Sequence, residues 1–493
     1  MEAPVITPSQ LKPGTISRPP VSDTYSKMMY EVVVLSLILT WFPSKILPYA
    51  SPFIIIGYTS IVYRNYQILF SFSKIFFLGL LFVGLNYLLR SNYIFSNGLL
   101  TLFTYGSFLL TWSFSRQGVS PWHMRKIYSI LYFAVVFQSV LGLSQFLIAY
   151  VKFGLYTLDM GDFIQGTIVP FSFNMDGDRG IGNAYFVINI LIMMLVLLTD
   201  TRKSKHFYKI IVLGSITVIL AGVHHALISF FLALFIALSI AEFKRAIKYA
   251  FLFVPAIIVT LTVFYFLNPN NVYLYSNYFN LYSSGESFKT IAMKRALIDL
   301  NRDHPDVSFF GTGPGQFSSR AGLLASGTYL GGLDENRSVP FFPIEKSEYF
   351  KNYAFDIYYS MKMDKSTVHG AASRTFFSLM SIYVELGMAL SIGIIIYLIR
   401  KIRMLKKRYK QFIEVNFIEG KTSIITIISA VLFFIFISFF ENYLEMTQAT
   451  MTSFLLIKIL CNNLNQYAPI VDKKNCEQLI INKENNNKLS HNR

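Results

Sequence analysis

The chain has 493 residues, of which 53% are hydrophobic and only 14% charged, and its mean hydropathy is +0.46. A soluble domain carries about a quarter of charged residues, so this composition argues against an ordinary soluble protein. The formal net charge of +17 would suit a nucleic-acid-binding protein, but the basic residues are concentrated in short loops between apolar segments, which argues against nucleic acid as a partner.

Apolar runs follow one another along the chain and predict an all-α, polytopic membrane protein with about twelve transmembrane helices. The predicted spans are 28–44, 51–63, 75–89, 96–115, 127–150, 181–199, 210–223, 226–241, 249–267, 375–399, 422–440 and 446–461. The predicted organisation is a cytoplasmic tail at 1–27, helices at 28–267, a loop domain at 268–372, helices at 373–461 and a cytoplasmic, disordered tail at 462–493. The first segment lacks the basic start and the cleavage site of a signal peptide.

Basic residues occur in alternate loops, and this pattern predicts the orientation of the helices. The predicted inner loops contain Arg116, Arg125 and Lys126, then Arg202, Lys203, Lys205 and Lys209, then Lys244, Arg245 and Lys248, and last the run from Arg400 to Lys410. Since Lys and Arg stay on the cytoplasmic side, we expect both termini in the cytoplasm and the loop domain outside it. Both cysteines, Cys461 and Cys476, lie near the C-terminus, so the loop has no disulfide framework.

The long loop at 268–372 is expected to have its own secondary structure, because structureless loops of this length are uncommon in compact domains. Residues 286–302 show helical spacing of apolar residues, and Pro305 with the glycines after it ends that pattern. Arg295 and Arg302 are seven apart and share a helix face, where two guanidinium groups suit a diphosphate. The alternative is ordinary surface pairing of both with Asp299.

Glycine and tyrosine residues in the same loop suggest contacts with a substrate. The tract GTGPGQF contains Gly313 and Gly315, which permit tight turns and the close approach of a ligand to the backbone. It lacks the Lys-Ser/Thr of a nucleotide-binding loop, so ATP is not expected. Tyr278 belongs to an aromatic cluster that could stack on a sugar, although Tyr near a bilayer also forms interfacial belts. The alternative is that the glycines form only a turn, as most tracts of this kind do.

Two adjacent histidines, His224 and His225, mark the outer turn between two predicted spans. Neighbouring residues on a helix point in different directions, and no Cys, Asp or Glu lies nearby in the sequence, so a metal site is not expected here. The two histidines could instead contact a polar substrate or interact with water at the end of a helix.

Four further ionisable residues lie at the predicted outer ends of spans or inside one. His369 could act as a general base near neutral pH. Arg374 and Arg179 could each bind a lipid head group or a diphosphate. The alternative for Arg374 is that its side chain extends to water at the membrane surface. The alternative for Arg179 is an ion pair with a nearby aspartate. Glu385 lies two to three turns into a span and is therefore expected to face protein or a cavity rather than lipid.

Several motifs in order resemble one known family. They are Arg295, His304-Pro305, the tract Gly311-x-Gly313-Pro-Gly315-x-Phe317, the re-entry segment SRTFFSLMSIYVELGM with Glu385-Leu-Gly387, and the earlier Asp178-Arg179-Gly180-Ile-Gly182-Asn183. This set is similar to the O-antigen polymerase and O-antigen ligase superfamily over residues of about 178–390.

The resemblance implies a metal-independent, cofactor-free glycosyltransferase of the GT-C type acting on undecaprenyl-diphosphate-linked glycans in a bacterial inner membrane. In a polymerase of this kind, a growing glycan leaves its lipid diphosphate and joins the sugar of a new repeat unit, giving O-antigen, capsule or exopolysaccharide. His369 and Arg295 are then the expected catalytic residues. Arg179, Arg302, Arg320 and Arg374 are expected to hold the diphosphate. Membrane lipids, a chain-length regulator and a flippase are candidate partners.

The chain departs from the family pattern at two places. His224-His225 stands where the family has Ser-Arg, and the His-Asn expected about nine residues before Glu385 is absent, since position 376 is Phe. Because a ligase would keep that histidine in register, the departure favours a polymerase over an O-antigen ligase that transfers glycan to lipid A core. A lipid-linked oligosaccharide transporter is the alternative of another class, but the chain shows no internal repeat and its long loop has no role in transport.

Overall fold

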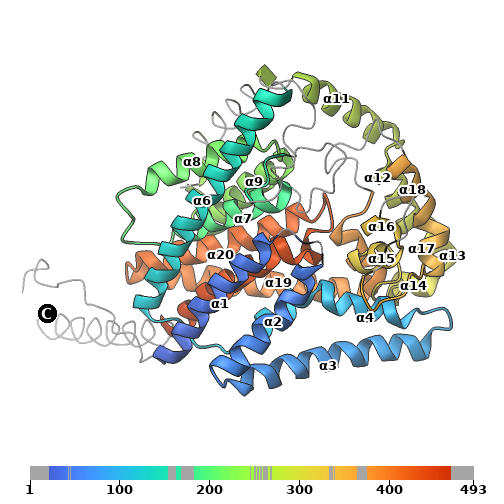
Figure 1. Ribbon diagram of the computed structural model, residues 1–493, viewed down its shortest axis with the longest axis horizontal. Coiled ribbons are helices and arrows are strands. Elements are labelled where there is room, and N and C mark those ends of the chain that lie inside the picture. The colour runs from blue at the N-terminus through green and yellow to red at the C-terminus, as the bar shows by residue number, and fades with distance from the viewer. Residues whose placement is uncertain are drawn as a thin grey trace, which may run out of the picture.

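The computed structural model describes residues 22–467 except 43, 45, 154–162, 168–182, 245, most of 249–268, 332–336, 338 and 364–374. Over this part of the chain the secondary structure is helical, without strands, as the sequence predicts (Figure 1). The helices are α1 (Asp23–Trp41), α2 (Leu47–Val62), α3 (Tyr66–Leu89), α4 (Phe95–Thr104), α5 (Gly106–Ser113), α6 (Pro121–Phe153), α7 (Asn183–Leu197), α8 (Phe207–Leu220), α9 (His224–Ala241), α11 (Pro269–Ser284), α12 (Phe288–Lys294), α13 (Leu300–Asp303), α14 (Pro305–Phe310), α15 (Arg320–Ala325), α16 (Thr328–Gly331), α17 (Glu348–Phe350), α18 (Asp356–Met363), α19 (Ser378–Glu414) and α20 (Ile418–Ile437), followed by a helix at 447–467. Two π-helical turns, η3 (Arg295–Asp299) and η4 (Lys351–Phe355), and the 3₁₀ turn η5 (Tyr443–Glu445) complete the list.

Among the described residues, five helices are long and apolar enough to cross a membrane. They are α3, the stretch Pro121–Val151 of α6, α9, α19 and α20. The shorter apolar helices α2, α7 and α8 lie beside them. Every predicted span except 249–267, most of which lies outside the described residues, coincides with a described helix. An all-helical, membrane-type protein is therefore confirmed.

Some predicted boundaries were wrong by a few residues. The first helix begins at Asp23, inside the predicted tail, because the Ser22 side chain caps it by accepting from the Tyr25 N–H at 3.3 Å. The predicted span 96–115 is two helices that meet at Tyr105. The last helix continues to 467, past the predicted end at 461.

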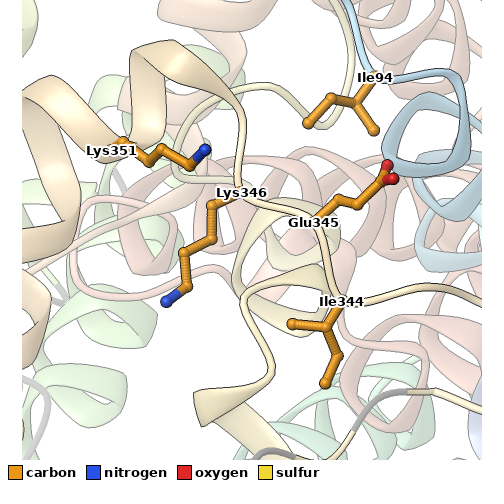
Figure 2. A pocket seen from close by; sticks show the side chains of 5 residues that line it. All are labelled: Ile94, Ile344, Glu345, Lys346 and Lys351. Carbon is orange, nitrogen blue, oxygen red and sulfur yellow. The ribbon is translucent and has the colours of Figure 1, made fainter.

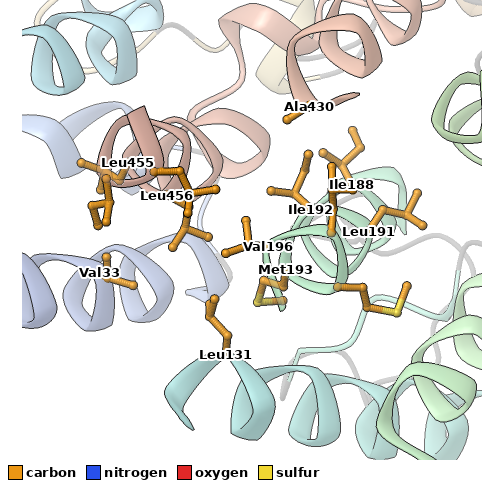
Figure 3. Packing of buried hydrophobic residues seen from close by; sticks show 14 of the residues in the cluster. Val33, Leu131, Ile188, Leu191, Ile192, Met193, Val196, Ala430, Leu455 and Leu456 are labelled. Carbon is orange, nitrogen blue, oxygen red and sulfur yellow. The ribbon is translucent and has the colours of Figure 1, made fainter. Parts of the chain in front are cut away.

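The centre of the bundle is α7, whose residues are buried almost without exception. Figure 3 shows Ile188, Ile192 and Val196 of α7 surrounded by Val33, Leu131, Ala430, Leu455 and Leu456 of four neighbouring helices. Hydrogen bonds tie the helices together inside this apolar core. Asn189 donates to the Gln448 carbonyl at 2.9 Å, for example. Such bonds between helices are a common means of association in membranes.

Helices at the edge of the bundle expose apolar side chains instead of burying them. Phe70 is 72% exposed, and Leu88 of the same helix, α3, is 79% exposed. The first half of α19 likewise presents Leu390 and Ile395, both about half exposed, to the outside. A contiguous apolar surface of this kind would be unfavourable in water and is the surface expected against lipid.

The loops between helices sort into two ends of the bundle. At one end, Tyr409 donates to Glu242 at 2.7 Å, and Asn462 donates to the Ser115 carbonyl at 2.9 Å. These contacts join the loops next to Arg116 and Lys244 to the basic end of α19 and to the last helix. At the other end, Asn183 donates to the Ala221 carbonyl at 3.2 Å. The pairing of loops therefore agrees with the predicted alternation, while the side that faces the cytoplasm stays a prediction.

The predicted loop domain at 268–372 contains α11 to α18, and its helices α14 and α15 pack on one end of the bundle, against α19 and α4 (Figure 1). It has its own core, in which Ala296, Phe317, Phe350 and Ile357 are buried. The predicted helix at 286–302 is confirmed as α12, η3 and α13. The predicted end of this helix before Pro305 is confirmed, since α13 ends at Asp303 and His304 is not helical. Pro305 then starts the separate short helix α14, where its missing N–H costs nothing.

Candidate functional site

The glycine-rich tract forms a buried nest of backbone N–H groups around an anion that the protein itself supplies. The carboxylate of Glu385 accepts from the N–H groups of Gly315 at 2.7 Å and of Phe317 and Ser319 at 3.1 Å each. These donors belong to every second residue, and a concave group of backbone N–H donors is a common binding site for an anion such as phosphate. Here they bind Glu385, which is 4% exposed and faces protein, as predicted. Contact of Gly313 and Gly315 with a substrate stays a prediction, and a structural role for both is clear.

The tract also needs glycine where it meets α19. Gly311 has φ of +73° and Gly387 has φ of +77°, and a Cβ on either would come within about 2.3 Å of a backbone oxygen of the other segment. Gly387 interrupts the helical geometry of α19 at this contact. Two glycines that touch back to back therefore fix the loop domain on the membrane helix, and they hold the segment that leads to Arg320.

Arg320 begins α15 and is 6% exposed. Its backbone N–H donates to the carboxylate of Glu445, which anchors the first turn of the helix. Its guanidinium donates to the hydroxyls of Tyr49 at 3.2 Å and Tyr185 at 3.3 Å, and it lies 4.1 Å from the ring centre of Tyr329. Three tyrosines from α2, α7 and α16 thus enclose one cation between the bundle and the loop domain.

The guanidinium of Arg320 has no carboxylate within 4.0 Å among the residues that the structure describes, although Glu445 binds its backbone. Most buried charges are paired directly, whereas the direct partners of this guanidinium are two hydroxyls and a ring, and the charges of Glu441 and Glu445 act on it from beyond 4.0 Å. Arg320 was predicted to hold diphosphate. The structure places it at the contact between the bundle and the loop domain, and binding of diphosphate by Arg320 stays a prediction.

A chain of aromatic and polar side chains extends from Arg320 to His225. The Tyr185 ring packs edge-on against Tyr443 with 6.4 Å between ring centres. The Tyr443 hydroxyl shares a 2.8 Å hydrogen bond with Nε2 of His225, whose ring stacks on it. Lys289 of α12 lies close by and donates to the Phe440 carbonyl at 2.8 Å. The site therefore contains two cations and one imidazole, which come from helices far apart in the sequence.

His224 and His225 have different surroundings, as their adjacent positions on α9 predict. His225 faces the tyrosine chain, whereas His224 is buried in the core and 7% exposed. Among the described residues no three His, Cys, Asp or Glu side chains come together as a metal site. Metal independence remains a prediction, and His225 is the better placed of the two for contact with a substrate.

Lys289 lies in an apolar setting, between the rings of Phe377 and Phe440. Burial lowers the pKa of Lys289 from 10.5 to about 8. The unfolded chain therefore binds more protons than the folded chain between pH 8 and 10.5, so this group makes the protein more stable as the pH rises through that window.

We expect the unfolding temperature of the native protein, relative to that of Lys289→Met, to rise between pH 8 and 10.5. Thermal unfolding of both proteins in the same detergent measures this difference, and effects shared with other titrating groups cancel. A difference that stays constant over the window would show that Lys289 keeps its ordinary pKa.

The arginines of the predicted diphosphate helix are placed differently from Arg320. Arg295 donates to both carboxylate oxygens of Asp356 at 2.7 Å. Its partner therefore belongs to α18 and not to its own helix. Arg302 is 69% exposed and pairs with Asp299 at 3.6 Å and Asp303 at 3.2 Å. The predicted pairing with Asp299 is therefore confirmed for Arg302 and wrong for Arg295, because α18 packs against α12 and brings Asp356 within reach of Arg295.

Several predicted site residues lie outside the described residues, namely Arg179, His369 and Arg374, as does the side chain of Tyr278, whose backbone belongs to α11. Other members of the site were not identified from the sequence: Tyr49, Tyr185, Tyr443, Glu445 and Lys289. A weak signal existed for Lys289, because it falls on the apolar face of its predicted helix, between Phe288 and Ala292. The other four residues belong to three separate segments, α2, α7 and η5, and no local pattern connects these segments.

Comparison with models of known protein families and with curated proteins gives no match for this chain. The resemblance to O-antigen polymerases and ligases therefore depends on the ordered motifs alone, and the function derived from it belongs to the proposal that follows.

Proposed function

We propose that this chain is a polysaccharide repeat-unit polymerase, which joins undecaprenyl-diphosphate-linked oligosaccharides by glycosyl transfer in a bacterial inner membrane. One observation carries the proposal: a buried guanidinium, Arg320, enclosed by tyrosines and without a carboxylate partner among the described residues. The diphosphate of a lipid-linked sugar would supply the missing negative charge.

In the proposed reaction, a sugar hydroxyl of one repeat unit attacks the anomeric carbon of the sugar on the other lipid. The new C–O bond forms as the bond to the diphosphate breaks, and the hydroxyl proton passes to a base. Negative charge develops on the leaving diphosphate, where a preorganised cation is most effective. Arg320 would stabilise that charge, with Tyr49 and Tyr185 holding the guanidinium in place. His369 is the proposed base.

The surroundings of Arg320 suit a substrate that is part lipid and part sugar. The tyrosine cage lies where the loop domain meets the membrane helices, so one substrate could contact both. Lys289 and His225 extend the polar surface away from Arg320 and could contact sugar hydroxyls or phosphate oxygens. About twelve spans in a GT-C arrangement, with both termini in the cytoplasm and the loop domain outside, are part of this proposal.

The activity can be tested with the purified protein and synthetic lipid-linked repeat units, scored for a ladder of chain lengths. A ladder that depends on the enzyme supports polymerisation. Transfer of a finished glycan to lipid A core without a ladder would instead indicate a ligase. Movement of lipid-linked oligosaccharide across vesicle membranes without new glycosidic bonds would indicate a transporter and would reject the proposal.

Arg295 offers a test of the predicted loop arginines. We expect Arg295→Ala to abolish the ladder if its guanidinium acts on the diphosphate, whereas Asp356→Asn, which removes only the partner of that guanidinium, should retain most activity. The same assay measures both variants, with membrane content as the control. Equal losses in the two variants would assign Arg295 to the internal structure of the loop domain.

A further inference from the structure

An open pocket of about 500 Å³ lies between the loop domain and the residue that precedes α4, and none of its lining residues belongs to the tyrosine cage. Its lining residues are Ile94, Ile344, Glu345, Lys346 and Lys351 (Figure 2). Pockets of about 300–1,000 Å³ are the usual size for small ligands. This volume would accept a sugar with its substituents, and the two isoleucines give the pocket an apolar wall.

The two lysines give the pocket a positive charge that the protein does not neutralise locally. Neither ammonium group lies within 4.0 Å of a carboxylate in the described ranges. Lys346 lies 3.8 Å from the ring centre of Phe355, which holds its ammonium group in place. Burial and then the charge of Lys351 lower the pKa of Lys346. An anion between the two groups would relieve this repulsion.

The one carboxylate of the pocket has another partner. Glu345 accepts from the Ser96 hydroxyl at 3.2 Å, and Figure 2 shows its carboxylate turned toward α4, while the ammonium of Lys346 points the other way. The Glu345 backbone is fixed as well, since its N–H donates to the Ala325 carbonyl at 3.0 Å. Both the carboxylate and the backbone of Glu345 are therefore hydrogen-bonded, and the carboxylate is turned away from the ammonium group of Lys346.

The same contact relates the pocket to the candidate site. Ala325 ends α15, the helix that Arg320 begins. At about 1.5 Å per residue, this helix is only about 9 Å long. The pocket and the guanidinium thus lie at the two ends of one short helix, within the reach of a single oligosaccharide.

We propose that this pocket binds an anionic substituent of the glycan, a carboxylate or a phosphate carried on a sugar, between Lys346 and Lys351. The inference depends on the proposed function for the identity of the glycan as substrate, and it narrows that substrate to repeat units with an acidic sugar. Ile94 and Ile344 contact the apolar face of the sugar ring, and the ammonium groups bind the charge.

The binding can be measured without any turnover, on the full-length protein in detergent micelles by calorimetry. The probes are a uronic-acid oligosaccharide, its carboxyl-reduced neutral counterpart and a phosphorylated oligosaccharide of the same length. We expect an acidic probe to bind at least about tenfold more tightly than the neutral one, and the advantage to be lost in the double variant Lys346→Gln/Lys351→Gln. Lys294→Ala, an exposed lysine of the same domain, is the matched control and should bind like the native protein.

Each outcome decides the inference. Preference for the uronic acid or for the phosphate identifies the source of the charge, and both support the pocket. Equal binding of acidic and neutral probes, or unchanged binding by the double variant, would overturn it. A native protein that binds acidic probes but makes no ladder would reject the polymerase and leave the pocket established.

Discussion

Replacement of Arg320 by alanine is expected to abolish the ladder of chain lengths, with a loss of activity of about 10²–10³-fold, the usual effect of removing one group that stabilises developing charge. The side chain is one of the two buried cations of the candidate site, and its guanidinium contacts two hydroxyls and a ring among the described residues. Polymerisation by the purified variant, measured as turnover at saturating substrate, gives the size of the effect.

Two further variants separate chemistry from folding. Arg320→Lys keeps the charge but not the two-sided hydrogen bonding, so we expect partial activity. Tyr185→Phe removes one hydroxyl from the cage and should cause a smaller loss than the loss of the guanidinium. Arg403→Ala, an exposed arginine at the far end of α19, serves as the control for arginine removal. If Arg320→Ala remained folded and produced a normal ladder, the diphosphate would have to bind elsewhere.

Replacement of Glu385 by alanine is expected to destabilise the loop domain strongly. It would leave the N–H groups of Gly315, Phe317 and Ser319 buried without their acceptor, and each buried donor without a partner costs about 1–3 kcal/mol. Since the same segment leads directly into Arg320, activity should fall together with stability. Chemical unfolding in detergent, followed by the fluorescence of the protein, measures the change.

Glu385→Gln is the matched control, because it keeps the shape of the side chain and one acceptor oxygen. We expect the stability of this variant to lie between those of the native protein and Glu385→Ala. If alanine were tolerated without loss of stability, the nest of N–H groups would be satisfied by water or by a substrate anion, and the structural role of Glu385 would be rejected.

The predicted helices were largely right because the pattern that defines them is local. A run such as that of α7 is apolar on all sides, and the structure buries it at the centre of the bundle. The position of Glu385 was predictable for the same reason: a carboxylate inside an apolar helix has to face protein. The break of α19 at Gly387 was not, since it depends on the contact with Gly311 of a distant segment.

Only some residues of the candidate site were predicted from the sequence. Arg320 and His225 were predicted individually, but nothing in the sequence connected them, and Tyr185 and Tyr443, which join them, were not identified. The glycine tract looked suited to phosphate because a nest of N–H groups binds anions in general. Which anion occupies it, an external phosphate or Glu385, depends on which helix packs there.

The sequence by itself determined that this protein is helical and suited to a membrane, because the length and hydropathy of each apolar run are properties of the run alone. Only the tertiary structure decided the partners of the charged groups: Asp356 for Arg295, three backbone N–H groups for Glu385, and a cage of tyrosines for Arg320. The physical reason is distance along the chain. A charge is stabilised by whatever lies within a few ångströms of it, and in this fold most of those groups come from segments separated by tens to hundreds of residues.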